Sequence, residues 1–180
     1  MFESLSVLEI ENIASGLVVL DVLSKKSLAT IKIAKAVTPG KFLIIFTANI
    51  AEGEESFNIA LEQAESKLID SLFIPQAHFA LIPAMSGIFQ SNNGESIGII
   101  ETKNISNCIN ATDIALKFAD VSLINMQLAK GIGGKGYILL NGKLSNIEIA
   151  VKYIKEAIDS KKIVAAEIIT RFNPDIEGFF

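Results

Sequence analysis

The chain of 180 residues is predicted to hold two tandem ferredoxin-like domains of the α/β (α+β) class, in unpermuted order. The first observation is self-similarity: residues 4–13 resemble residues 96–105, and the same offset of 92 carries Asp21 onto Asp113. The second is that strand-like and helix-like apolar patterns follow each other as β-α-β-β-α-β in both copies. The two copies therefore predict the same fold twice.

Each copy opens with an apolar strand and an apolar-periodic helix, followed by a second strand, a glycine-containing loop, a third strand, a second helix and a last strand. The expected ranges are 5–11, 14–25, 29–37, 42–46 and 53–68 in the first copy, and 97–103, 106–118, 121–129, 137–140 and 145–159 in the second. Ser145 with Glu148 predicts a capping box at the last helix. The predicted domains are 1–90 and 94–180, joined at Ser91-Asn92-Asn93-Gly94.

Composition narrows the class of protein. Half of the residues are hydrophobic and the mean hydropathy is +0.44, so we expect apolar surface hidden between subunits. The net charge is −4 and the 16 Lys and Arg residues are scattered, which argues against nucleic-acid binding. Residues 71–94 lack charge, but Pro75, Pro83 and Gly87 interrupt them, so no membrane helix is expected. The N-terminus lacks a signal-peptide pattern, and the single cysteine, Cys108, allows no intrachain disulfide.

Residues with possible chemistry have structural interpretations. The run 131–136 satisfies G-x-G-x-x-G, but an apolar strand follows it where nucleotide binding requires a helix N-terminus. Cys108 has only Lys103 nearby to activate it, and His78 has no Cys or Glu at metal-ligand spacing. We therefore expect residues 131–136 to form a turn, Cys108 to be a buried structural thiol and His78 to have a structural role. No enzyme activity is expected.

Several segments of the second copy resemble a known family. They are Glu101-Thr102-Lys103, Asn110-Ala111-Thr112-Asp113, Lys130 to Lys135, and Asn141-Gly142-Lys143-Leu144. They are similar to segments at the corresponding places of bacterial microcompartment shell domains. Two such domains in unpermuted order resemble the tandem, trimer-forming shell proteins, most closely the PduT-like type of propanediol-utilisation shells. The resemblance spans nearly the whole chain.

The resemblance implies a structural shell protein: a homotrimer that forms a flat pseudohexameric tile with a central pore for small metabolites, without nucleic-acid or membrane partners. The implied pore-lining residues are Thr38, Pro39, Gly40, Lys41, Gly131, Ile132, Gly133, Gly134 and Lys135. Lys103 is implied at the tile edge, in contact with other shell proteins, where the first copy has Glu11. The implied location is a bacterial microcompartment in the cytoplasm.

One position departs from that type. Its members can hold an iron–sulfur cluster on the threefold axis through a cysteine directly before Pro-Gly-Lys, and this chain has Thr38 there. A hydroxyl is a poor cluster ligand, so we expect no cluster, no metal and no cofactor.

Two alternatives stay open: a ferredoxin-like trimeric sensor of a small ligand, and an electron or metal conduit at the axis. Lys41 and Lys135 either create a positive field at the opening or are solvated charges. The tail that ends in Phe179-Phe180 either covers the tile or binds a partner.

Overall fold

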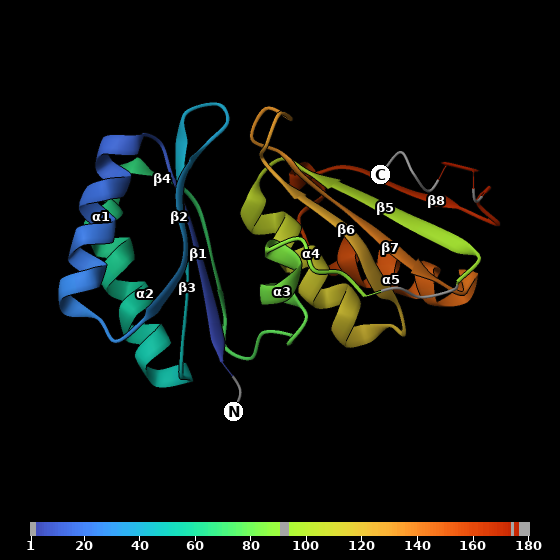
Figure 1. The fold of residues 1–180 in the computed structure, drawn as a ribbon, viewed down its shortest axis with the longest axis horizontal. Coiled ribbons are helices and arrows are strands. Elements are labelled where there is room, and N and C mark those ends of the chain that lie inside the picture. Colours follow the sequence, from blue (N-terminus) through green and yellow to red (C-terminus); the bar gives the residue numbers. More distant parts are fainter. Residues whose placement is uncertain (1–2, 91–93, 174, 177–180) are drawn as a thin grey trace. The chain divides into compact units, whose positions relative to one another are not determined.

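The computed structural model describes residues 3–90, 94–173 and 175–176 (Figure 1). It divides into two compact units, Met1–Ala77 with Lys130–Gly134, and His78–Ala129 with Lys135–Phe180. Each unit contains one four-stranded antiparallel sheet, as the two sequence copies predicted. The Phe179-Phe180 tail and the joint residues 91–93 lie outside the described residues.

The first unit packs two helices on one face of its sheet (Figure 1). Its elements are β1 (Ser4–Ile10), α1 (Ile13–Lys26), β2 (Thr30–Val37), β3 (Lys41–Ala48), α2 (Ile50–Ala64), the 3₁₀ turn η1 (Glu65–Lys67) and β4 (Leu68–Ile74). The strand order β2-β3-β1-β4 is that of a ferredoxin-like sheet. Apolar side chains of α1, such as Leu23, pack with those of the central strands, such as Leu8 and Phe46, to form its core.

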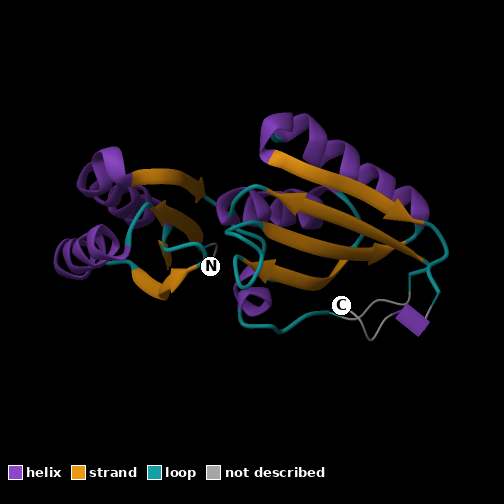
Figure 2. Cartoon of the chain, turned by 90° about the horizontal axis from the view of Figure 1, so that it is seen from above, coloured by secondary structure: helices purple, strands orange, loops and turns teal. Residues whose placement is uncertain are grey.

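The second unit repeats this plan and adds one short helix (Figure 2). Its elements are α3 (Leu81–Met85), β5 (Ser96–Thr102), α4 (Ile105–Phe118), β6 (Ser122–Leu128), β7 (Gly136–Gly142), α5 (Leu144–Ala157), the 3₁₀ turn η2 (Ser160–Lys162) and β8 (Ile163–Ile169). The strand order is β6-β7-β5-β8. The sequence predicts a first domain over residues 1–90, whereas in the structure residues 78–90 pack with the second unit.

Helices α1, α2 and α4 each begin at an asparagine. The side chains of Asn12, Asn49 and Asn104 each accept a hydrogen bond from the backbone N–H three residues ahead, at 2.9 to 3.0 Å. Helix α5, in contrast, begins after Lys143, which makes no side-chain cap. Ser145 lies inside α5, so the predicted capping box is wrong.

The first helix of each repeat lies very close to the third strand of its sheet. The glycine that allows this contact is on the helix in the first unit and on the strand in the second. In the first unit Gly16 of α1 lies against Phe42, and a Cβ on Gly16 would come within 2.3 Å of the Phe42 Cβ. In the second unit the helix contributes Cys108 and the strand contributes Gly136, whose Cβ would come within 2.5 Å of the Cys108 Cβ. Because Gly136 has no side chain, the Cys108 side chain fits against β7 at this place, where it is fully buried.

No helix in the described part of the chain is long and apolar enough to cross a membrane.

Candidate functional site

The loop between β2 and β3 consists of Thr38, Pro39 and Gly40, which are all exposed. The Gly40 N–H donates to the Val37 carbonyl at 2.8 Å and closes the turn. Gly40 has φ +124°, a conformation that L side chains rarely adopt, and a Cβ placed there would meet no atom within 4 Å. Glycine is therefore required by the backbone rather than by crowding within the chain.

The corresponding loop of the second copy, between β6 and β7, spans residues 130–135. The Ala129 N–H donates to the Lys135 carbonyl at 2.9 Å across its base. Gly131, Gly133 and Gly134 all have positive φ, and Gly131 and Gly133 would also accept a Cβ without contact. The loop leads into strand β7 and not into a helix, so it lacks the helix N-terminus with which a G-x-G-x-x-G loop binds phosphate.

The lysine that follows each loop is bound to a carboxylate of its unit's first strand. The Lys41 Nζ lies 2.6 Å from Glu9 Oε2, and the Lys135 Nζ lies 2.8 Å from Glu101 Oε1. The Glu9 side chain is fully buried and that of Lys41 is 12% exposed, whereas Glu101 and Lys135 are 33% and 45% exposed. Both lysines are therefore ion-paired. The sequence predicted either a positive field at the opening or solvated charges, and neither prediction included an ion pair.

These glutamates were not predicted, although the repeat contains the signal. Glu9 and Glu101 are related by the offset of 92, and each occupies the same register position beside the strand that leaves the loop: Glu9 opposite Leu43, and Glu101 opposite Tyr137. A carboxylate at the same register position of the first strand in both copies indicates a charged partner at the same place in each.

The residues predicted for an edge differ in charge between the copies although their backbones match. The Glu11 N–H donates to the Lys67 carbonyl at 2.8 Å, and the Lys103 N–H donates to the Lys162 carbonyl at 2.9 Å. The Glu11 carboxylate also pairs with the Lys67 Nζ at 3.1 Å. Lys103 is exposed. The same structural position thus presents a carboxylate in one unit and an ammonium group in the other.

His78 has a structural environment. Its Nδ1 accepts from the Ala80 N–H at 3.3 Å, and its ring packs on Phe79 at a centroid distance of 4.4 Å. Burial lowers the pKa of His78; the nearby Asp113 carboxylate opposes this shift and Lys117 adds to it. Among the described residues, no group of three or more His, Cys, Asp or Glu side chains is placed to hold a metal ion.

Comparison with known proteins gives a consistent result. The family model described as the BMC domain matches residues 4–77 and 96–172. The bacterial microcompartment shell protein PduT of Citrobacter freundii is 30% identical over 164 residues, covering 91% of this chain and 89% of PduT. The carboxysome shell protein CsoS1C of Halothiobacillus neapolitanus is 31% identical over 87 residues, covering 47% of this chain and 87% of CsoS1C.

Solved structures agree. The crystal structure of a microcompartments protein from Desulfitobacterium hafniense DCB aligns with a TM-score of 0.87 and 26% identity, over 99% of both chains. A fused permuted hexameric shell protein of the RMM microcompartment aligns with a TM-score of 0.64 and 21% identity, over 86% of this chain and 83% of its own, which shows a shared fold. These relatives give no support to a ligand sensor or to an electron or metal conduit.

Proposed function

Because the chain belongs to the BMC-domain family of bacterial microcompartment shell proteins, whose role is structural, we propose that three copies close into a pseudohexameric tile with a central pore. The observation that carries the proposal is the pair of glycine loops, 38–41 and 131–135, at the same place in each repeat. Gly40, Gly131 and Gly133 have open space beside them, which suits a position where several backbones converge on an axis.

The pore passes small metabolites without strong selection by these lysines. Each of Lys41 and Lys135 is offset by a glutamate within 2.8 Å, so the field that an unpaired ring of lysines would produce is largely cancelled. Thr38, Pro39 and Ile132 supply uncharged surface to the same opening. Thr38 also replaces the thiolate that a cluster on the axis requires, and the chain functions without a cofactor or catalysis.

Lys103 lies at the tile edge and contacts neighbouring shell proteins in the cytoplasmic microcompartment. Its exposed ammonium group, at the position where the other unit has the Glu11–Lys67 pair, gives the two kinds of edge different charges. Charge differences of this kind select among neighbours more than they add affinity.

The solution mass of tag-free protein tests the trimer. Light scattering is expected to give about 58 kDa, three times the 19.4 kDa chain. A monomer at working concentration would refute both the tile and the pore.

A thiol placed in the loop then tests the pore. In Thr38→Cys, the new thiols of different copies should meet at the axis, so mild oxidation should join two chains of each trimer as a covalent dimer. Ser66→Cys, exposed on η1 outside the loops, is the matched control and should stay uncrosslinked. A Thr38→Cys trimer that forms no interchain disulfide would place the loops away from the axis.

A further inference from the structure

Helices α1 and α4 have the same length and the same place in the repeat but very different burial. Ten of the residues of α4 are buried, against only three of α1. Ile13 and Leu17 of α1 are 43% and 52% exposed, whereas their counterparts Ile105 and Ile109 are fully buried. Val18 beside them is 53% exposed. The outer face of α1 is thus an apolar surface that its counterpart in the second unit does not expose.

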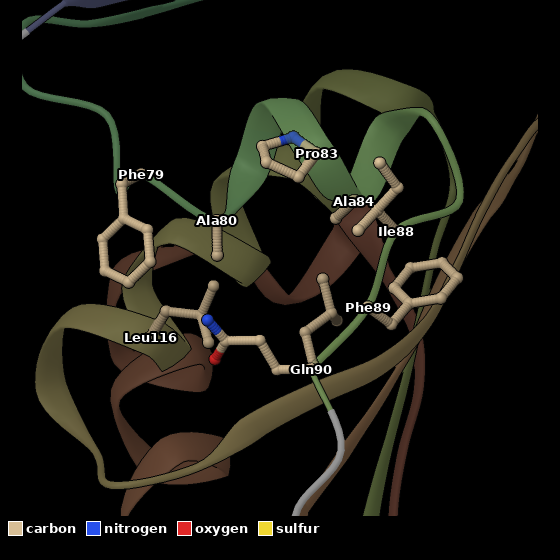
Figure 3. A pocket seen from close by; sticks show the side chains of 9 residues that line it. Phe79, Ala80, Pro83, Ala84, Ile88, Phe89, Gln90 and Leu116 are labelled. Atoms are coloured by element: carbon tan, nitrogen blue, oxygen red, sulfur yellow. The ribbon is translucent and has the colours of Figure 1, made fainter.

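Residues 78–90, which follow the first copy in the chain, lie against α4 and β6. The His78 backbone N–H donates to Asp113 Oδ1 at 2.8 Å. Beyond it, a cavity of about 220 Å³ is lined by Ala80 and Ala84 of this segment and by Leu116 of α4 (Figure 3). The segment after one copy therefore contacts the first helix of the copy that follows it, at Asp113 and beside Leu116.

Asp21 of α1 is the counterpart of Asp113. Both carboxylates pair with a lysine four residues later, but only that of Asp113 also accepts a backbone N–H. Asp113 Oδ2 pairs with Lys117, and Asp21 Oδ2 pairs with Lys25 at 2.7 Å. Asp113 Oδ1 accepts the His78 N–H, whereas the structure records no such donor for Asp21 Oδ1 among the described residues. The Asp21 side chain is 56% exposed.

The segment after the second copy begins at a fixed place in the repeat. Ile74 pairs with Leu5 at the end of β4, and Ile169 pairs with Ile97 at the end of β8, so these two positions are equivalent. Counting four residues onward from each places Asn173 at the position equivalent to His78.

The local folding of the two segments also matches. The Asp175 N–H donates to Asn173 Oδ1 at 3.0 Å, as the Ala80 N–H does to the His78 ring. The Ile176 N–H donates to the Asn173 carbonyl at 3.1 Å, as the Leu81 N–H does to the His78 carbonyl at 3.0 Å. The second segment thus has the turn with which the first one reaches its helix.

We infer that α1 of one chain is covered by the segment that follows β8 in a second copy, with the Asn173 backbone N–H of that copy bound to Asp21 Oδ1. The inference rests on the proposed trimer, in which the repeat that follows the second copy is the first copy of the next chain. The contact joins two different surfaces, so it is heterologous and closes a ring instead of a two-fold dimer. Burial of Leu17 and Val18 supplies the apolar part of the interface.

Directed crosslinking tests the inference. Chains carrying Asp21→Cys and chains carrying Asn173→Cys, each with a different tag, are co-expressed and oxidised. We expect a disulfide that joins one chain of each kind, and none when either variant is expressed alone. His78→Cys with Asp113→Cys is the matched control, because the equivalent contact lies within one chain and should close internally.

Failure of the inference and failure of the proposed trimer are distinguishable. A protein of trimer mass without the mixed disulfide would overturn this interface and leave the trimer standing, as would disulfides formed by either variant alone. A monomer would overturn both.

A charge on the exposed face of α1 tests the same interface without cysteines, in case the cysteine variants perturb folding. Leu17→Glu should abolish the trimer peak while the circular dichroism spectrum is retained, whereas Ile149→Glu, on α5 and 41% exposed, should keep the trimer. An intact Leu17→Glu trimer would also overturn the inference.

Discussion

The ion pairs Lys41–Glu9 and Lys135–Glu101 differ in burial, so the effect of burial on the stability that an ion pair contributes can be measured within one chain. Lys41→Met leaves the Glu9 carboxylate without the Lys41 ammonium group in a fully buried position. Removing one partner of a buried pair costs about 3–5 kcal/mol, because the charge that remains is shielded from water. Lys135→Met leaves Glu101, which is 33% exposed and can be hydrated, so its cost should be about 0–1 kcal/mol.

Urea unfolding followed by far-UV circular dichroism measures the difference, since the chain has no tryptophan to report by fluorescence. With a denaturant slope of about 1–3 kcal/mol/M, Lys41→Met should lower the midpoint of the affected unit by at least about 1 M. The double variant Glu9→Gln with Lys41→Met removes the remaining charge and should recover most of that loss. Equal midpoint shifts for the two lysine variants, or no recovery in the double variant, would refute the argument from burial.

Other consequences are simpler to measure. Because burial lowers the pKa of His78, the folded second unit favours the neutral ring; that contribution is complete above the usual histidine pKa and is lost as the pH falls through the lower folded value. The melting temperature should therefore fall as the pH is lowered from about 7 to about 5. In His78→Asn, which keeps a hydrogen-bond acceptor, this fall in melting temperature should be smaller. Gly16→Ala should destabilise the first unit by about 1–3 kcal/mol in urea unfolding, since its Cβ would collide with Phe42; wild-type stability would contradict the observed packing. Lys103→Ala should reduce the extent of two-dimensional sheets in electron micrographs while trimer mass is unchanged, and unaltered sheets would show that Lys103 is only a solvated surface charge.

Local patterns in the sequence predicted the elements because apolar periods of 2 and 3.6 residues follow directly from strand and helix geometry. Their ends were less accurate. The third strand was expected at 42–46 and runs over Lys41–Ala48, because its ends lie beyond the apolar run. The second helix was expected at 53–68 and spans Ile50–Ala64, because Asn49 caps it and the chain turns into η1 at Glu65.

The repeat itself was determined by the sequence alone: two copies of one pattern imply two copies of one fold, and the glycines of both loops indicate turns with positive φ. The partners of Lys41 and Lys135, the exchange of glycine between helix and strand around Cys108, and the exposed face of α1 required the tertiary structure. Each depends on which strands pair and in what register, and residues such as Glu9 and Lys41, 32 positions apart, become neighbours only after the sheet has formed. The sequence therefore shows which residues repeat. The charged partner and the burial of each residue depend on strand pairing and register, which only the tertiary structure shows.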